Sequence, residues 1–543
     1  MIASGVFLQK RPHLKIVLGA AIGFWLVCAA LALWRYYQFY PSYATFDQGI
    51  FNQVFWNSLH GNFFQSSLSS TESIAVAQDG AVPTVAYHRL GQHFTPSLML
   101  WLPIYALFPS PAGLSLLQVT LVAIAGLVLY ALARQRLAPP PSVWITLSYF
   151  VANAVIGPTL ANFHDFSQIP LFIFGLLLAL EKRWWRVVAL LAVLTLLVRE
   201  DAGVVLFGVG FYLALQRQWR GLGFALCLLS VAYMAVLTLV VMPLFSEDLS
   251  RRFMVEQFGQ FVGEEDASTV EVVWGMLTQP FILIRELLSP IGLTLRYLLG
   301  QGLPLAFVPW VSPTSWSIAG FPLLQVLLRQ DPSSLALDRR YAITLVPGLF
   351  YGAILWWAQH SHRFTQRFRR IWLLCMALAL GLTLTANPNR AMSWVVPDSI
   401  QPWVYTSPAR QVAHAQAIRS LLAEIPPDAS VSASSFIVPH VSGRREALRF
   451  PQLRLQTDRS QVIAVDYAVV DLWQFQQYQS VFPWEQEQLQ RSLKGVDRMV
   501  QSDRYGVTQF QDGVVLLQRG VESDEKALND WTGYRSSLNS ASL

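Results

Sequence analysis

Residues 14–53 read LKIVLGAAIGFWLVCAALALWRYYQFYPSYATFDQGIFNQ, an apolar run that ends in aromatic residues and is followed by one acid, Asp47. The run matches the length of roughly 20 apolar residues that crosses a bilayer. Its last part, Trp34-Arg35-Tyr36-Tyr37, is typical of a lipid–water interface. No small-residue cleavage site follows the run, so the sequence predicts an uncleaved first membrane helix and not a signal peptide.

The composition extends this prediction to the rest of the chain. Of the 543 residues, 53% are hydrophobic and only 13% are charged, and the mean hydropathy is +0.39. A soluble domain carries about 25% charged residues. The chain is therefore predicted to be an integral membrane protein that crosses the bilayer many times.

Eleven apolar runs are long enough to be candidate spans, although the count between residues 273 and 340 stays open. They are residues 14–35, 112–133, 141–159, 166–181, 185–199, 202–216, 221–244, 281–299, 303–328, 341–359 and 371–387. If each run crosses once, five basic clusters fall on one side, which the positive-inside rule makes cytoplasmic. These clusters are Lys10/Arg11/Lys15, Arg134/Arg136, Lys182/Arg183/Arg186, Arg217/Arg220 and Arg363/Arg367/Arg369/Arg370. The sequence thus predicts a multi-pass protein of a bacterial-type inner or plasma membrane, with a cytoplasmic N-terminus and an extracytoplasmic C-terminal part.

The charge balance argues against a nucleic-acid partner. Residues 1–389 hold 24 Lys and Arg against 17 Asp and Glu, whereas residues 390–543 hold 15 against 16. A basic excess confined to the membrane part is explained by the inner loops. Membrane lipid is the partner that this pattern indicates.

Two regions outside the spans have their own organisation. The first outer loop, residues 36–111, contains a predicted helix from Phe46 to His60 closed by Gly61, and a run from Phe94 to Phe108 broken by prolines. Both are expected to be amphipathic helices at the membrane interface. Residues 390–520 are predicted to form an extracytoplasmic α/β domain, with strands at 430–434 and 462–472 and a hairpin turn at 511–514. Residues 521–543 are expected to be a flexible tail.

Carboxylates are rare in the membrane part, and four of them fall at predicted helix ends on the outer side. They are Asp47, Asp165, Glu200 and Asp201. The same side carries imidazoles and guanidiniums at His93, His164, Arg89, Arg199 and Arg340, with Tyr341 beside the last. Ionisable groups in a membrane protein are costly and often functional.

Plainer interpretations of these residues stay open. Asp47 could cap the helix that follows it, and His93 could cap the interfacial helix that begins near Phe94. The corner Arg199-Glu200-Asp201 could be a solvated helix end, and Phe163-His164-Asp165 could be a hydrated loop. The sequence has no phosphate-binding glycine loop, no dinucleotide fingerprint, no zinc-protease helix and no nucleophile elbow. Soluble nucleotide-driven chemistry is therefore unsupported.

The most specific motif of the chain is Phe46-Asp47-Gln48-Gly49-Ile50-Phe51-Asn52-Gln53 with Trp56-Asn57 and His60-Gly61. Further motifs are His93-Phe94-Thr95-Pro96, Phe163-His164, Arg199-Glu200-Asp201-Ala202, the stretch from Ile425 to Ala433, Pro439-His440 and Arg444-Arg445-Glu446. Together these motifs resemble a family of polytopic membrane proteins without assigned activity, domain of unknown function 2079. The chain departs from the family pattern at Arg340-Tyr341, where a His-Tyr pair is frequent.

That family is similar in plan to the GT-C membrane glycosyltransferases, which take sugar from polyprenyl-phosphate or polyprenyl-diphosphate donors. By analogy, the resemblance implies a mostly helical GT-C-like bundle in which Asp47 matches the first-loop catalytic acid and Glu200 and Asp201 form a second acidic site. The first-loop acid is single here, whereas several GT-C branches have a pair. The implied partners are a lipid-linked sugar donor and an unknown acceptor.

Three functions follow as hypotheses. The first is an inverting membrane glycosyltransferase, a hexosyl- or pentosyltransferase, with Asp47, Glu200 and Asp201 as catalytic residues. Its substrate would be bound by His93, His164, Asp165, Arg199, Arg89, Arg340 and Tyr341. Mg²⁺ or Mn²⁺ would suit Asp47, Glu200 and Asp201, but nothing in the sequence requires a metal. The alternatives are a transporter or lipid flippase that uses the same outer residues, and a non-enzymatic scaffold with an outer sensing domain.

Overall fold

The computed structural model describes residues 12–246, 258–262, 269–502 and 504–540. Two compact units make up the chain. Unit 1 comprises residues 1–32, 90–101 and 114–389, and unit 2 comprises residues 33–89, 102–113 and 390–543. Most of the first outer loop therefore folds with the C-terminal residues, and not with the N-terminal 389 residues as the sequence predicted. Lys10, Arg11 and residues 247–257 and 263–268 of the outer loop 245–280 lie outside the described residues.

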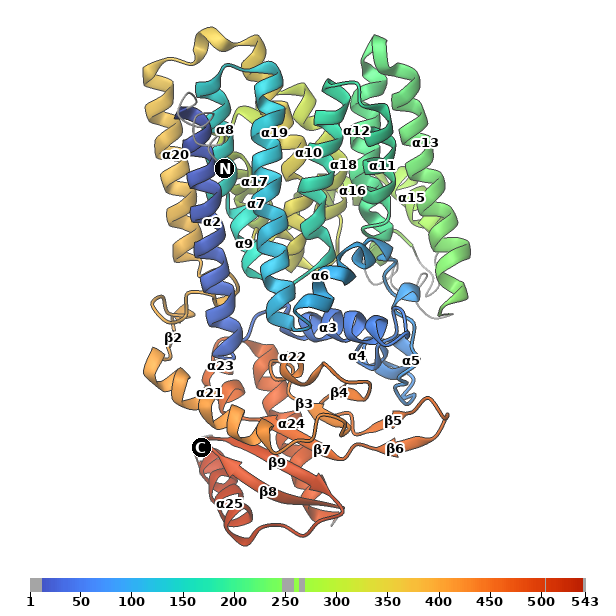
Figure 1. The fold of residues 1–543 in the computed structure, drawn as a ribbon, viewed down its shortest axis with the longest axis vertical. Coiled ribbons are helices and arrows are strands. Elements are labelled where there is room, and N and C mark those ends of the chain that lie inside the picture. The colour runs from blue at the N-terminus through green and yellow to red at the C-terminus, as the bar shows by residue number, and fades with distance from the viewer. Residues whose placement is uncertain (1–11, 247–257, 263–268, 503, 541–543) are drawn as a thin grey trace, which may run out of the picture. The chain divides into compact units, whose positions relative to one another are not determined.

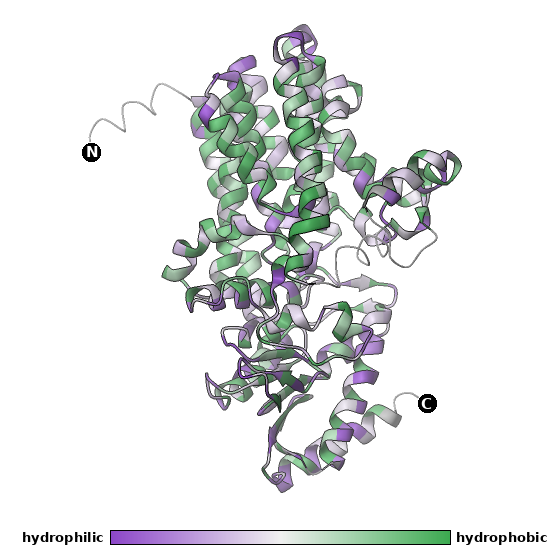
Figure 2. Cartoon of the chain, turned by 90° about the vertical axis from the view of Figure 1, so that its right-hand side faces the viewer, coloured by the Kyte–Doolittle hydropathy of each residue, from purple (hydrophilic) through white to green (hydrophobic). Residues whose placement is uncertain are grey.

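Unit 1 is built from helices, most of them strongly apolar (Figures 1 and 2). They are α2 (Pro12–Tyr37), whose last turns belong to unit 2, α7 (Pro111–Arg136), α8 (Pro139–Val151), α9 (Asn153–Leu160), α10 (Ile169–Glu181), α11 (Trp185–Leu196), α12 (Gly203–Leu215), α13 (Arg220–Val236), α15 (Thr269–Thr278), α16 (Pro280–Leu288), α17 (Ile291–Gly302), α18 (Pro313–Leu327), α19 (Val346–Gln359) and α20 (Gln366–Thr385).

Five helical stretches within the described residues are long and apolar enough to cross a membrane: Pro12–Tyr37, Pro111–Arg136, Arg217–Leu244, Arg340–Gln359 and Gln366–Thr385. A sixth is obtained if α8 and α9, which meet at an angle of 41°, count as one span. The other predicted spans correspond to shorter helices such as α10, α11 and α12. The structure thus supports a multi-pass membrane protein, with fewer full-length spans than the eleven predicted.

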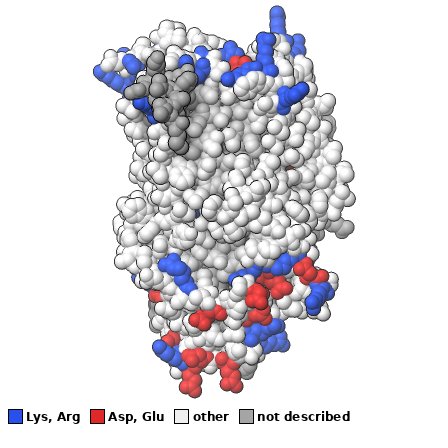
Figure 3. All heavy atoms as spheres, in the orientation of Figure 1, with Lys and Arg blue, Asp and Glu red and all other residues white. Residues whose placement is uncertain are grey.

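Charged side chains of unit 1 are concentrated at the ends of its helices. In Figure 3 Lys and Arg gather at the upper end of this unit, and the side below them is almost uncharged. The connections between α10 and α11, α12 and α13, and α19 and α20 carry exposed Lys182, Arg217 and Arg363 among other basic residues. An uncharged belt beneath a basic rim fits a bilayer with basic loops on one side.

Glycines allow the closest helix approaches in unit 1. A Cβ at Gly208 on α12 would overlap the carbonyl oxygen of Ile318 on α18, and one at Gly223 on α13 would overlap the backbone of Ala214 on α12. Small residues at such crossings let helix backbones pack closely in a membrane.

Unit 2 combines short helices of the first outer loop with an α/β fold (Figure 1). The loop helices are α3 (Thr45–Leu59), α4 (Ser67–Ser70), α5 (Ile74–Ala77) and α6 (Leu102–Leu107). The later helices are α21 (Pro408–Ala423), α22 (Val438–Val441), α23 (Trp473–Tyr478), α24 (Pro483–Gln501) and α25 (Glu525–Ser540). The strands are β1 (Ser399–Ile400), β2 (Trp403–Val404), β3 (Val431–Ala433), β4 (Ala447–Arg449), β5 (Arg454–Gln456), β6 (Val462–Ala464), β7 (Tyr467–Asp471), β8 (Tyr505–Gln511) and β9 (Val514–Arg519).

The main sheet has the strand order β4-β3-β7-β9-β8. Strand β3 is parallel to β4 and β7, whereas β9 is antiparallel to β7 and β8. The predicted hairpin turn joins β8 to β9, and Asp512 and Gly513 both have positive φ there (54° and 76°). The predicted strand 462–472 is instead two strands in different sheets, because the chain turns at Val465 and Asp466, where the Asp466 carboxylate accepts a hydrogen bond from Ser430 N–H.

Helix α3 corrects the prediction of an amphipathic interfacial helix. Its polar residues are as buried as its apolar ones, because their amides find partners within unit 2. Gln48 Nε2 donates to the carbonyl of Pro111 (2.8 Å), and Asn52 Nδ2 donates to Ser442 Oγ (2.9 Å). A Cβ at Gly49 would lie 2.6 Å from Val438 Cγ1, so this glycine lets α3 and α22 approach each other.

The final residues correct a second prediction. Instead of a frayed tail, residues 525–540 form α25. Asp524 caps this helix by accepting from Ala527 N–H (2.8 Å), and Trp531 is buried against Phe510 of β8. The cap and the buried aromatic ring are two of the contacts that hold this largely polar helix in place.

Candidate functional site

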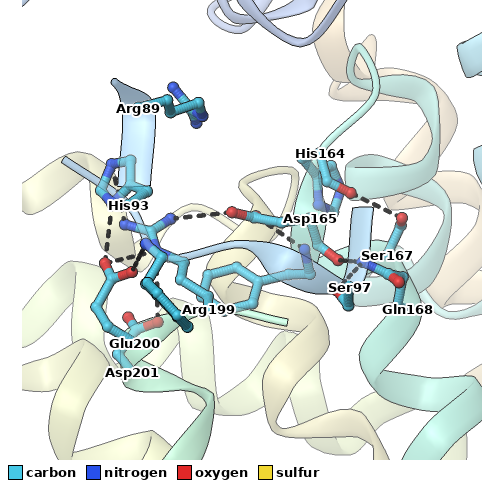
Figure 4. Close-up of polar contacts among 12 residues, drawn as sticks. Arg89, His93, Ser97, His164, Asp165, Ser167, Gln168, Arg199, Glu200 and Asp201 are labelled. Carbon is cyan, nitrogen blue, oxygen red and sulfur yellow. Dashed lines mark hydrogen bonds and ion pairs between the residues drawn. The ribbon is translucent and has the colours of Figure 1, made fainter. Parts of the chain in front are cut away.

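A cluster of buried charges lies in unit 1, where connections between the helices meet (Figure 4). It consists of His93, Asp165, Arg199, Glu200, Asp201 and Arg329, and we call it the buried ion cluster. The Arg199 side chain is only 1% exposed and that of Asp165 is fully buried. This burial excludes the interpretations of the Arg199 corner as a solvated helix end and of His164-Asp165 as a hydrated loop.

Arg199 is the centre of the cluster because three carboxylates surround its guanidinium. Its Nε lies 3.1 Å from Glu200 Oε1 and 3.4 Å from Asp201 Oδ1, and Nη1 lies 3.9 Å from Asp165 Oδ2. The backbone makes this arrangement possible. Arg199 is extended (φ −168°) where α11 has ended, and a 3₁₀ turn, η4 (Glu200–Ala202), follows it. The break in the helix brings three consecutive ionisable side chains together.

His93 closes the cluster from the connection before the 3₁₀ turn η2 (Pro96–Trp101). Its Nδ1 lies 2.8 Å from Glu200 Oε1, and Glu200 Oε2 accepts a hydrogen bond from Phe94 N–H (2.9 Å). The ring is therefore bound to Glu200, and the prediction that it caps a following interfacial helix is wrong. A histidine–carboxylate pair in this environment can hold and exchange a proton.

Asp201 faces a second cation that sequence reasoning missed. Its Oδ2 accepts from Gln325 Nε2 (3.0 Å) and pairs with Arg329 Nη2 (3.3 Å). Burial raises the pKa of the Asp201 carboxyl above its ordinary value, while Arg199 and Arg329 oppose that rise. The sequence does contain one indication of this cation, because Arg329 is the first charged residue after Arg296 and ends a long uncharged stretch.

Tyr341 and Arg340 lie beside this second cation. The Arg329 guanidinium stacks over the Tyr341 ring at 3.7 Å, and Arg340 lies 5.7 Å from the same ring. Phe166, next to Asp165, is in edge contact with Tyr341 at 6.1 Å. The structure therefore brings the predicted substrate-binding residues Arg340 and Tyr341 next to the buried ion cluster.

His164 and Asp165 are held by hydrogen bonds to the backbone. Asp165 Oδ1 accepts from Phe166 N–H (2.9 Å), and the His164 ring approaches the Pro158 carbonyl (3.2 Å). The next turn, η3 (Asp165–Gln168), is tied to η2 because Gln168 Nε2 donates to Ser97 Oγ (3.0 Å). Asp165 thus contributes its charge to the cluster, whereas the His164 side chain bonds to α9.

Asp47 belongs to unit 2, in the first turn of α3. The helix begins at Thr45, and Ala44 is its N-cap residue, so the capping interpretation of Asp47 is wrong. A carboxylate in the first turn is still favoured by the helix dipole.

Asp47 has an acidic neighbour in the same loop. This neighbour is Glu72, and burial raises the pKa of its carboxyl above the ordinary value. The positive charge of Arg449 opposes this rise, and the negative charge of Asp47 adds to it. Arg449 pairs with Glu72 at 2.6 Å, and its guanidinium lies 4.5 Å from the Phe46 ring. Glu72 is thus a second acid whose charge interacts with that of Asp47. The spacing of residues in the sequence could not show that Arg449, from strand β4, binds Glu72.

Arg89, the remaining predicted residue, also belongs to unit 2. It is buried, its Nη1 lies 3.4 Å from Ser69 Oγ, and its guanidinium lies 4.7 Å from the centre of the Phe51 ring. Among the described residues, no group of three or more His, Cys, Asp or Glu is arranged to hold a metal ion.

Comparison with known proteins agrees with this architecture. No curated protein matches the chain. A family model described as predicted membrane protein (DUF2079) matches residues 35–516, which is most of the sequence and includes every motif that suggested this family. The chain belongs to the membrane protein family known as domain of unknown function 2079.

Proposed function

We propose that this protein is a membrane glycosyltransferase that transfers a sugar from a polyprenyl-phosphate-type donor to an acceptor on the extracytoplasmic face. The buried ion cluster of unit 1 is the observation that supports this best. Three carboxylates, two guanidiniums and an imidazole are held in a unit whose helices are otherwise apolar. Burying so many charges is costly, and membrane proteins retain them mainly for function.

The proposed reaction is a single displacement at the anomeric carbon. The acceptor hydroxyl forms the new C–O bond, the bond between the anomeric carbon and the phosphate oxygen breaks, and the polyprenyl phosphate leaves with the bonding electrons. Asp47 takes the proton of the hydroxyl, a role typically worth about 10²–10⁴-fold in rate. The configuration of the sugar inverts.

The cations of unit 1 have the chemistry to bind the donor phosphate. Planar guanidiniums match phosphate oxygens. Arg340 and Arg329 flank Tyr341, whose ring could also stack on a sugar. Arg199 is surrounded by three carboxylates, so we assign it to positioning Glu200 and Asp201.

The test is a transfer assay with purified protein in lipid nanodiscs and synthetic polyprenyl-phosphate sugars. We expect Asp47→Asn to lose transfer while donor binding stays, and Glu200→Gln to lose transfer as well. The matched controls are Asp530→Asn, on the exposed side of α25, and Glu286→Gln on α16. Full transfer by Asp47→Asn would remove this residue from catalysis.

Transport is the second candidate, and one observation favours it. The α8–α9 pair is bent by 41°, and broken helices are frequent at transporter binding sites. The same nanodisc protein in liposomes separates the two functions. Movement of the lipid-linked sugar across the bilayer without any new glycosidic bond would favour a flippase.

A further inference from the structure

The β1–β2 hairpin of unit 2 presents large apolar side chains to the outside. Ile400 is 77% exposed, Trp403 65% and Val395 58%, and Trp394 and Tyr405 are also exposed. Between Ala391 and Pro408 the only charged residue is Asp398. Soluble surfaces seldom show a continuous apolar patch of this kind without a partner.

The only charged residue of this segment, Asp398, holds the hairpin in place through hydrogen bonds. Asp398 accepts hydrogen bonds from Ser393 Oγ (2.7 Å) and Tyr478 Oη (2.8 Å), and its N–H donates to the Val404 carbonyl (2.8 Å). The Tyr405 hydroxyl donates to the Trp394 carbonyl (3.1 Å). Asp398 is turned into unit 2, so the outward side of the hairpin is left uncharged.

The hairpin is close to two candidate membrane spans in the chain or in the fold of unit 2. Trp394 follows the end of the candidate span α20, at Thr385, by nine residues. Tyr40, three residues past the end of α2, lies within electrostatic range of Asp398 and Tyr405. The hairpin therefore lies near the residues that directly follow the first candidate span.

We propose that the β1–β2 hairpin inserts Trp394, Val395, Ile400 and Trp403 into the headgroup region of the bilayer and anchors the C-terminal part of unit 2 to the membrane surface. Trp and Tyr are enriched at this depth because each has an apolar body and a polar tip. Contact with the lipid interface is also favourable for an apolar surface without charge, whereas contact of the same surface with water is unfavourable.

Site-directed spin labelling of the full-length protein in nanodiscs tests this proposal. Single cysteines replace Ile400 or Trp403 after Cys28, Cys227 and Cys375 have been changed to alanine. The control label is at Val462 on β6, which is exposed in the same unit. We expect labels at 400 and 403 to collide more with oxygen and less with a water-soluble nickel complex than the label at 462.

A label at a different position covers the case in which labels at 400 or 403 disturb the hairpin. With a label at Val395, the double substitution Ile400→Glu and Trp403→Glu is expected to shift the collision ratio at 395 towards that of water. Equal nickel access at 400, 403 and 462 would overturn the proposal. Labels that are immobilised and reached by neither oxygen nor nickel would also overturn it, because a protein partner would then cover the hairpin.

Discussion

Nδ1 of His93 lies 2.8 Å from Oε1 of Glu200, although 107 residues separate the two in the chain. This contact joins the connection before η2 to the corner between α11 and α12. It brings the family motifs at His93 and Arg199 together, and Asp165, next to the Phe163-His164 motif, faces the same Arg199 guanidinium.

Arg199 should be essential for the stability of unit 1. Arg199→Met leaves three carboxylates without their central cation, and removing one partner of a buried pair costs about 3–5 kcal/mol. We expect a clear fall in the thermal unfolding temperature in nanodiscs, and a smaller fall for Arg199→Lys. Arg217→Met, at an exposed position, serves as control. An unchanged unfolding temperature for Arg199→Met would contradict the ion network described for this site.

His414 should make the C-terminal part of unit 2 sensitive to alkaline pH. Burial alone would lower the pKa of this histidine, but Asp471 and Asp512, at 2.8 and 2.9 Å, raise it from 6.5 to about 9. A raised pKa stabilises the fold fully below pH 6.5, and the stabilisation is lost as the pH rises through about 9. The loss is on the order of 3 kcal/mol.

Hydrogen exchange of β7 and α21 in the full-length protein checks this prediction. Protection should fall between pH 6.5 and about 9 in the wild type, after correction for the intrinsic exchange rate. His414→Gln should be less protected at the lower pH and should lose the pH dependence. Equal protection across this range in the wild type would refute a charged His414.

Gly208 should be required where α12 crosses α18. A Cβ there would overlap the carbonyl oxygen of Ile318, and overpacking a close contact costs about 1–3 kcal/mol. Gly208→Ala should therefore lower the unfolding temperature in nanodiscs. Gly320→Ala on α18 is the matched control, since its new Cβ would have no atom within 4 Å.

Patterns along the chain were enough to predict much of the fold. Apolar length predicted the apolar helices, of which five or six among the described residues are long enough to cross a membrane, and the Asp512-Gly513 pair predicted the β8–β9 turn. Both are local properties of the sequence. The position and length of helix α3 were predicted correctly, but its predicted place at the membrane interface was wrong. Amides such as Gln48 and Asn52 suggested a water-facing side, and only the folded chain supplies their partners, at Pro111 and Ser442.

The candidate site was predictable only as a set of residue types on one side of the membrane. The pairs His93–Glu200 and Asp201–Arg329 form because turns that are far apart in the chain meet in the fold. The spacing of residues along the sequence does not show which turns meet. Glu72 and Arg449 were missed for the same reason. The α25 helix was missed because its order depends on contacts with residues distant in the chain, such as the packing of Trp531 on Phe510.

The hydrogen bonds of Gln53 have a consequence for how the protein is made. Its amide binds Ser67 and also the carbonyls of Arg444 and Arg445, about 390 positions later in the chain. The residues that bind this early loop are therefore synthesised only after the last membrane helix. Until then the loop must wait outside the bilayer with its backbone and amides bound to water or to a chaperone, so its folding is among the last steps of biogenesis.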